Sequence, residues 1–185
     1  CGAAGGDSLD MGKRSNFERV ERDFYPTPYE AVVPLLPHLE PLVSFDEPCA
    51  GNGALVEILE NTGRLCASMS DIEPQIKQIE RKDLFSITKC TGDMFITNPP
   101  WDRKILHPLI DSLARLAPTW LLFDADWMHT RQSAPLMHNC RKIVSVGRVK
   151  WIPGSKMTGK DNCAWYLFEQ TNDWRTPATE FYGRI

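Results

Sequence analysis

The chain has 185 residues, a formal net charge of −3, 42% hydrophobic residues and 24% charged residues. This length fits one domain with a complete hydrophobic core, and the composition argues against intrinsic disorder. The net charge excludes a uniformly basic nucleic-acid-binding protein, although it is compatible with a local basic patch. No apolar run in the sequence is long enough to span a bilayer.

The six cysteines and four histidines are not spaced as metal ligands. No two cysteines form the close pairs that are typical of zinc sites, so we expect no metal. The start of the sequence lacks the apolar stretch of a signal peptide, which predicts reduced thiols and a cytoplasmic protein. Residues 1–19 are expected to form a disordered tail, whose first ten residues we interpret as a cloning remnant ahead of Met11.

Short apolar runs alternate with helical patterns along the chain, which is typical of an α/β fold with a mostly parallel sheet. The expected strands cover residues 42–45, 65–70, 82–85, 93–97 and 119–123. The expected helices cover residues 54–63, 104–116 and 130–139. Residues 142–152 and 163–169 flank a loop rich in Gly and Lys and are expected to form an antiparallel β-hairpin.

The stretch EPCAGNGALVE (47–57) places a glycine-rich turn between an expected strand and an expected helix. Gly51 and Gly53 allow a tight turn and a close approach of a ligand to the backbone at the start of the helix. Val56 breaks the dinucleotide pattern G-x-G-x-x-G, and no Gly-Lys-Ser/Thr follows as in a phosphate loop. The turn therefore favours a nucleoside ligand without a triphosphate, although a plain strand–helix connection remains the alternative.

Two acidic residues follow at the ends of later expected strands. Asp71 is placed to accept hydrogen bonds from both hydroxyls of a ribose. Glu73 is a second candidate for this role, and the alternative for Asp71 is a purely structural role in the turn after the strand. Asp83 is placed to accept a hydrogen bond from the amine of an adenine. The carboxyl ends of parallel strands meet at one edge of a sheet, so these groups are expected to line one site.

The stretch FITNPPW (95–101) ends an apolar run with an amide, two prolines and a tryptophan. Prolines cannot extend a strand because they lack the N–H group. The Asn98 amide oxygen and the Pro99 carbonyl would be two acceptors for one –NH₂ group, and Trp101 would offer a flat face to a planar base. A rigid turn without a ligand is the alternative.

Taken in order, DFYPTP (23–28), EPCAGNG and TNPPW resemble the class I S-adenosylmethionine-dependent methyltransferases that act on the exocyclic amines of adenine N6 and cytosine N4. The arrangement is most similar to the small stand-alone enzymes of phages and prophages, and GRVKWIPGSKMTGKDNCAWYLF (147–168) resembles their closing β-hairpin. The resemblance covers residues 20–170. It implies a Rossmann-like fold in one domain, without a separate target-recognition domain, and a peripheral tail over residues 171–185.

The resemblance also implies roles for individual residues. Asn98, Pro99 and Trp101 would form the catalytic target pocket. The cofactor S-adenosylmethionine would lie against Tyr25, Thr27, Pro28, Glu47, Cys49, Gly51, Gly53, Asp71 and Asp83. A thiolate mechanism at cytosine C5 is disfavoured, because the only Pro-Cys pair, Pro48-Cys49, lies in the glycine turn rather than in the NPPW position.

Residues 141–160 contain six basic and no acidic side chains. This run indicates either a solvated hairpin face or an arm that contacts phosphates, and the resemblance favours the arm, with Arg148, Lys150, Lys156 and Lys160 as nucleic-acid contacts. The expected reaction is methyl transfer to the amine of a flipped DNA base, adenine N6 first, in the cytoplasm of a bacterium or a phage-infected cell. The alternatives are an RNA base, a protein glutamine, or an inactive methyltransferase-fold subunit. We expect either a short or loose recognition sequence or a partner subunit that supplies target recognition.

Overall fold

The computed structural model describes residues 25–152, 159–170 and 179–184. Its strands form one eight-stranded sheet in the order β3-β2-β1-β4-β5-β7-β6-β8. The strands are β1 (Ser44–Glu47), β2 (Leu65–Asp71), β3 (Glu80–Arg81), β4 (Met94–Thr97), β5 (Thr119–Asp124), β6 (Cys140–Arg148), β7 (Asn162–Phe168) and β8 (Glu180–Tyr182). The α-helices are α1 (Tyr29–Val32), α2 (Ala54–Asn61), α3 (Arg103–Ala114) and α4 (Ala134–Met137). The 3₁₀ helices are η2 (Val33–His38), η3 (Leu84–Ser86) and η4 (Ala125–His129).

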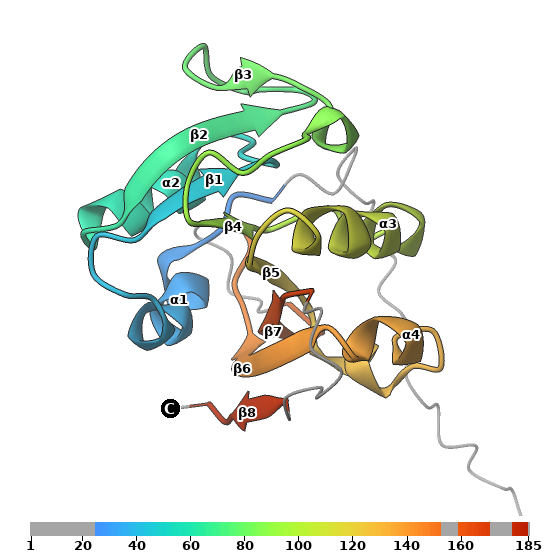
Figure 1. Cartoon of the computed structure of the whole chain (residues 1–185). Helices are drawn as coiled ribbons and strands as arrows, with labels where there is room; N and C mark the ends of the chain where they lie inside the picture. Colours follow the sequence, from blue (N-terminus) through green and yellow to red (C-terminus); the bar gives the residue numbers. More distant parts are fainter. Residues whose placement is uncertain (1–24, 153–158, 171–178, 185) are drawn as a thin grey trace, which may run out of the picture.

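The sheet is parallel from β3 to β5 and antiparallel around β7 (Figure 1). The mostly parallel α/β fold predicted from the sequence is therefore confirmed. The antiparallel pairing of β6 with β7 confirms the predicted hairpin. Because the parallel strands all run in one direction, the residues that follow β1, β2 and β4 meet at one edge of the sheet.

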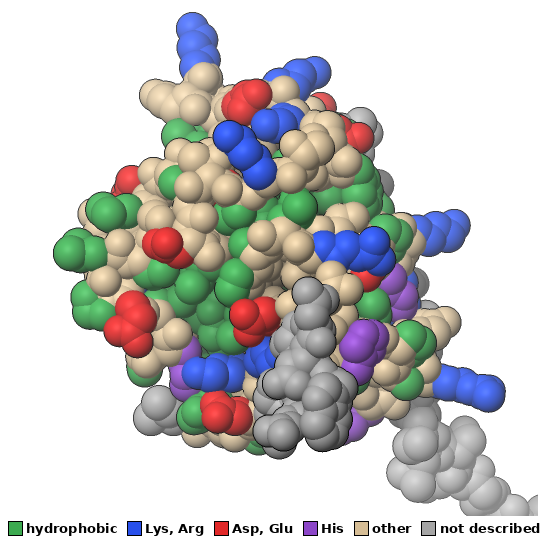
Figure 2. Space-filling view, in the orientation of Figure 1, with side chains coloured by type: hydrophobic (Ala, Val, Ile, Leu, Met, Phe, Trp, Pro, Cys, Tyr) green, Lys and Arg blue, Asp and Glu red, His purple; other side chains and the backbone are tan. Residues whose placement is uncertain are grey.

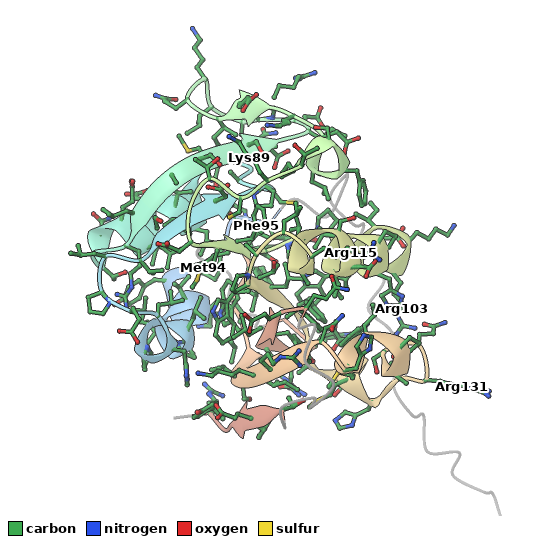
Figure 3. The ribbon with its side chains drawn as sticks, in the orientation of Figure 1. Lys89, Met94, Phe95, Arg103, Arg115 and Arg131 are labelled. Carbon is green, nitrogen blue, oxygen red and sulfur yellow. The ribbon has the colours of Figure 1, made fainter. Side chains whose placement is uncertain are left out.

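Two apolar layers cover the two faces of the sheet. On β5, Trp120 and Leu122 pack with α1 and α2, whereas Leu121 and Phe123 pack with α3. This division follows from the alternation of side chains along a strand, and it explains why β5 is buried on both faces. Phe95 of β4 is fully buried in the α3 layer and lies in the middle of the molecule (Figure 3).

Helix α3 has the buried stripe of an amphipathic helix. Leu106, Leu109, Ile110 and Leu113 repeat at intervals of three and four residues and face the sheet. The side chain of Asp102 caps its start by accepting the backbone N–H of Lys104 at 2.9 Å. The helix begins at Arg103 and continues through Pro108, whose ring removes the N–H that would otherwise bond to the Lys104 carbonyl.

Two predicted elements differ in the structure. The strand expected over residues 82–85 is replaced by the two-residue β3 and by η3, because the Asp83 side chain accepts the N–H of Phe85 at 2.9 Å and turns the chain. The helix expected over residues 130–139 is only the four-residue α4, which has Pro135 in its first turn. The chain already turns at η4, where the Asp124 side chain accepts the N–H of Asp126 at 2.9 Å.

The described end of the chain adds a strand that the sequence did not predict. Residues of β8 pair in parallel with β6 at the edge of the sheet, at the bottom of Figure 1. Thr179 donates a hydrogen bond to the Cys140 carbonyl at 2.9 Å, and Lys142 lies 3.8 Å from the Glu180 carboxylate. These contacts attach residues 179–182 to the sheet.

The opposite end of the sheet has little helical cover. Between β2 and β4 the described chain forms only turns, β3 and η3. Leu65 at the start of β2 and Leu42 ahead of β1 are exposed, and hydrophobic side chains show on this side of the molecule (Figure 2). None of the described helices is both long enough and apolar enough to cross a membrane.

Candidate active site

A cavity of about 930 Å³ lies where β1, β2 and β4 end. Its lining residues come from the segments 25–27, 47–55, 71–75, 83–85 and 98–105. These segments are far apart in sequence and meet because the parallel strands end at the same edge. Ligands of open α/β sheets bind at this edge, so the cavity is the candidate functional site.

The glycine turn forms the floor of the cavity. Gly51 and Gly53 have φ angles of +54° and +82°, a region in which a side chain would strain the backbone. The turn is tied to its neighbours by backbone hydrogen bonds, from Ala50 N to the Ser70 carbonyl at 2.9 Å and from Gln75 N to the Gly51 carbonyl at 2.9 Å. Helix α2 begins directly after Gly53, so its N-terminus lies beside the turn, where the Ala54 N–H donates to the Asn52 side chain at 3.2 Å.

The carboxylate of Asp71 joins two strands of the site. One oxygen accepts the N–H of Gly51 at 2.8 Å, and the other accepts the N–H of Glu73 at 2.7 Å. Asp71 therefore fixes the glycine turn as well as lining the cavity. Each carboxylate oxygen can accept a second hydrogen bond, so this role leaves capacity for a ligand hydroxyl.

Glu47 is a buried carboxylic acid at the end of β1. Its Oε2 atom has no hydrogen-bond partner within the described residues, and its side chain lines the cavity. Burial, followed by repulsion from the Asp71 charge, raises its pKa well above the usual range of a glutamate. The site thus contains an acid that would gain stability from a cationic or hydrogen-bond-donating group of a ligand.

Cys49 lies between these two acids. Burial and the charges of Asp71 and Glu47 raise the pKa of its thiol, which favours the neutral form. A neutral thiol is a poor nucleophile. The structure therefore adds a physical reason against the thiolate mechanism that the sequence disfavoured.

The Asn98 amide lies at the far side of the cavity, directly after β4. Its Nδ2 atom donates to the hydroxyl of Thr27 at 3.2 Å, and its Oδ1 atom accepts the indole N–H of Trp101 at 3.4 Å. Asn98 and Pro99 each precede a proline, which keeps the chain extended there. The amide is thus held at both ends at the rim of the cavity.

Three aromatic rings lie close together next to this amide, and one of them, Trp101, is hydrogen-bonded to it. The rings of Trp101 and Trp151 meet edge to face with centroids 5.8 Å apart, and the centroids of Tyr25 and Trp151 are 6.3 Å apart. A Cβ atom on Gly159 would lie 3.2 Å from the Trp151 ring, so the return of the chain toward β7 packs tightly against this ring. Trp151 was not predicted as a site residue, although its place in the basic hairpin segment was a usable signal.

The cavity brings together most of the predicted residues. Its lining includes Tyr25, Thr27, Glu47, Cys49, Gly51, Asp71, Asp83 and Asn98. Four others, Pro28, Gly53, Pro99 and Trp101, lie next to lining residues without lining the cavity themselves. The sequence analysis missed Ile72, which follows Asp71 at the end of β2, and Phe85 in η3; both are exposed apolar side chains that line the cavity.

The described basic residues of the predicted arm are partly exposed and partly buried. Arg148, Lys150 and Lys160 are exposed at the ends of β6 and β7, and Lys156 lies outside the described residues. In the same run, Arg141 is buried and donates to the carbonyls of His138 and Glu169 at 2.8 Å, so it supports the fold. Figure 3 shows a further cation, Arg131 ahead of α4, pointing away from the molecule.

No protein-family model and no curated protein sequence match the chain. Among solved structures, it is similar to a proposed RNA methyltransferase from Pyrococcus horikoshii, with a TM-score of 0.54 and 15% identity over 84% of this chain and 91% of that one. It is also similar to a proposed class I S-adenosylmethionine-dependent methyltransferase from Listeria monocytogenes, with a TM-score of 0.55 and 11% identity over 91% and 67% of the two chains. A third similar structure is a modification subunit of a proposed type I restriction enzyme from Vibrio vulnificus, with a TM-score of 0.53 and 13% identity over 86% and 47%.

At these identities the similarity shows the fold alone. The chain has the Rossmann-like fold of class I methyltransferases, with a mostly parallel sheet and an antiparallel hairpin at its end. The chain spans about half the length of the Vibrio vulnificus subunit.

Proposed function

We propose that this protein transfers a methyl group from S-adenosylmethionine to the exocyclic amine of a nucleic-acid base, with N6 of a flipped DNA adenine as the leading target. The observation that supports this proposal most directly is the Asn98 amide, held at both ends at the rim of a cavity whose floor is a glycine turn. This geometry supports the proposal, because the amide oxygen would serve as a hydrogen-bond acceptor for an amine and the glycine turn would bind a nucleoside-type cofactor.

The residues of the cavity fit this cofactor. The buried Oε2 atom of Glu47, which has no hydrogen-bond partner among the residues that the structure describes, suits a ligand ammonium group, because a nearby positive charge favours the ionised acid. Asp71 and Asp83 suit the ribose and the adenine amine, while Ile72 and Phe85 offer apolar surface to a planar ring. When bound, the cofactor supplies an electrophilic methyl group on a positively charged sulfur.

Asn98 would act by electrostatic complementarity. The exocyclic nitrogen of adenine is a weak nucleophile because its lone pair is delocalised into the ring. Acceptors on its two N–H groups, the Asn98 Oδ1 atom and the Pro99 carbonyl, favour a pyramidal nitrogen and stabilise the positive charge that develops on it. The extra proton then leaves to solvent, so the chain needs no general base and forms no covalent bond to the substrate.

The exposed cations of the hairpin support a nucleic-acid substrate. Arg148, Lys150 and Lys160 would contact phosphates, which position a duplex without reading its sequence. An exocyclic amine in a duplex is out of reach of a cavity, so the base must be flipped at a cost of a few kcal/mol. A small arm of this kind favours a short or loose recognition sequence, or a partner subunit that supplies recognition.

The proposal is tested by incubating the protein with methyl-labelled S-adenosylmethionine and with duplex DNA, single-stranded DNA or RNA, followed by nucleoside analysis. Label in N6-methyladenine from DNA is the expected result. Label in RNA or in cytosine would change the substrate and keep the reaction type. Micromolar cofactor binding without transfer to any of these would favour an inactive methyltransferase-fold subunit and overturn the proposal.

A further inference from the structure

We propose that Thr27 and Trp101 act together as a clamp that fixes the orientation of the Asn98 amide, so that its oxygen rather than its nitrogen faces the target amine. Both are positioning residues in this role, which rests on the proposed amine methylation. The clamp gives Trp101 a function other than stacking on the base.

The need for a clamp follows from the shape of an asparagine side chain. Its oxygen and its –NH₂ group have nearly the same size, so rotation about the last side-chain bond exchanges an acceptor for two donors at little steric cost. An amine that presents its N–H groups would be bound by the first orientation and repelled by the second. The orientation of Asn98 therefore decides whether the cavity accepts this amine.

The two hydrogen bonds favour one orientation. The indole N–H of Trp101 can only donate, so the Asn98 atom that it contacts at 3.4 Å must be the oxygen. The hydroxyl of Thr27 accepts from the opposite amide atom, Nδ2, at 3.2 Å. A rotated amide would place its –NH₂ group against the indole N–H, and this donor–donor contact would replace a hydrogen bond.

Both partners are held firmly by their surroundings. Thr27 is 6% exposed, and its segment continues into α1, which is attached to β7 by the hydrogen bond from Trp165 Nε1 to the Ala31 carbonyl at 2.7 Å. Trp101 packs against both apolar layers and against the ring of Trp151. Trp101 does not line the cavity, whereas Asn98 does. Trp101 is therefore placed to orient the Asn98 amide from outside the cavity.

The clamp also links two ligand sites. Thr27 lies in the segment that lines the cavity beside the glycine turn, and it is 71 residues from Asn98 in sequence. A change at Thr27 therefore reaches the target acceptor directly, even if the cofactor is bound normally. This separates a positioning role from a role in cofactor affinity.

Four variants test the clamp. Thr27→Val and Trp101→Phe each remove one hydrogen bond and keep most of the shape, Thr27→Ser keeps the hydroxyl, and Thr119→Val is the matched control. Thr119 is a fully buried threonine outside the cavity, whose hydroxyl donates to the Ala117 carbonyl at 2.9 Å. We expect the single-turnover methyl-transfer rate to fall about tenfold in Thr27→Val and in Trp101→Phe, to be restored by the hydroxyl of Thr27→Ser, and to stay near wild type in the control Thr119→Val. The cofactor Kd is measured in each variant, and we expect it to change less than the rate.

Nuclear magnetic resonance of the Asn98 –NH₂ group gives a readout that does not depend on activity. Its signals are assigned by their loss in Asn98→Asp. We expect Thr27→Val and Trp101→Phe to shift them and to speed their exchange, and Thr27→Ser and Thr119→Val to leave them unchanged. Unchanged signals in both clamp variants would overturn the clamp, even if no substrate had been found. If the signals shift in both clamp variants but the wild-type protein transfers no methyl group to any amine, the clamp is retained and the proposed function is overturned. An altered cofactor Kd with an unchanged transfer rate in Thr27→Val would overturn the clamp.

Discussion

The Asp71 carboxylate accepts the backbone N–H of Gly51 at 2.8 Å, and this bond joins the end of β2 to the turn that follows β1. The same carboxylate accepts the N–H of Glu73 at 2.7 Å. One side chain thus orders both segments on which a ribose would lie. The residue expected to bind the ligand is also the one that shapes its site.

Replacing Asp71 with alanine is expected to reduce stability and cofactor binding together. The variant leaves two backbone N–H groups without their charged acceptor, which costs roughly 1–3 kcal/mol in the free energy of unfolding. Urea denaturation and calorimetry with S-adenosylmethionine measure the two effects. Asp111→Ala is the control, because Asp111 pairs with Arg115 on the exposed side of α3 and such pairs contribute little. Weakened binding without loss of stability would contradict the structural role.

The raised pKa of Glu47 predicts how the free energy of unfolding depends on pH. Its pKa is raised in the folded protein, so its contribution to stability is complete below the unfolded pKa, near 4.5, and is lost as the pH rises toward the folded pKa. The free energy of unfolding of wild type should therefore fall relative to that of Glu47→Gln as the pH rises above about 5. Urea denaturation of both proteins from pH 5 to pH 8 measures this difference.

Saturating cofactor should reduce this pH dependence. A ligand ammonium near the Glu47 carboxylate would favour the ionised form and lower the pKa, so that binding releases a proton. Calorimetry in buffers of different ionisation enthalpy detects that proton. Equal pH profiles for wild type and Glu47→Gln, with and without cofactor, would mean that Glu47 does not titrate in this range and does not meet the cofactor.

The sequence predicted the parts of the site that depend on strand ends. Gly51, Asp71 and Asn98 each follow an apolar run, and a parallel sheet brings such positions to one edge whatever the details of the loops. The same reasoning correctly paired residues of β6 and β7, where the hydrophobic pattern continues on both sides of a loop.

The parts that the sequence did not predict depend on local side-chain bonds and on long-range packing. The Asp83 carboxylate caps η3 by accepting the N–H of Phe85. This bond turns the chain, so residues 82–85 do not form the strand that the sequence predicted. Strand β8 has three residues, all exposed, and pairs with β6 at the edge of the sheet. A strand this short shows no alternation of buried and exposed side chains from which it could be predicted. The contact of Trp101 with Asn98 depends on how an indole packs between two apolar layers, which spacing along the chain does not specify.

Asn98→Ala is expected to lose methyl transfer and to keep cofactor binding. Removal of a hydrogen-bond acceptor aimed at developing charge should reduce the transfer rate by about 100-fold or more. The cofactor would still meet the glycine turn, Glu47 and Asp71, so its Kd should change little. Single-turnover kinetics and calorimetry separate these effects. Equal losses of transfer and of cofactor binding would show that Asn98 holds the cofactor.

The exposed cations of the hairpin predict a salt-dependent change in nucleic-acid binding. Lys150→Ala combined with Lys160→Ala should weaken duplex binding and reduce the slope of log K against log salt by about 0.9 for each phosphate contact that is lost. Fluorescence anisotropy at several salt concentrations measures the slope. Arg115→Ala is the matched control, because Arg115 is an exposed cation at the far end of α3 and is paired with Asp111 at 2.5 Å. If the double variant kept the wild-type slope, or if Arg115→Ala reduced the slope equally, the hairpin would be a solvated face and the phosphates would bind elsewhere.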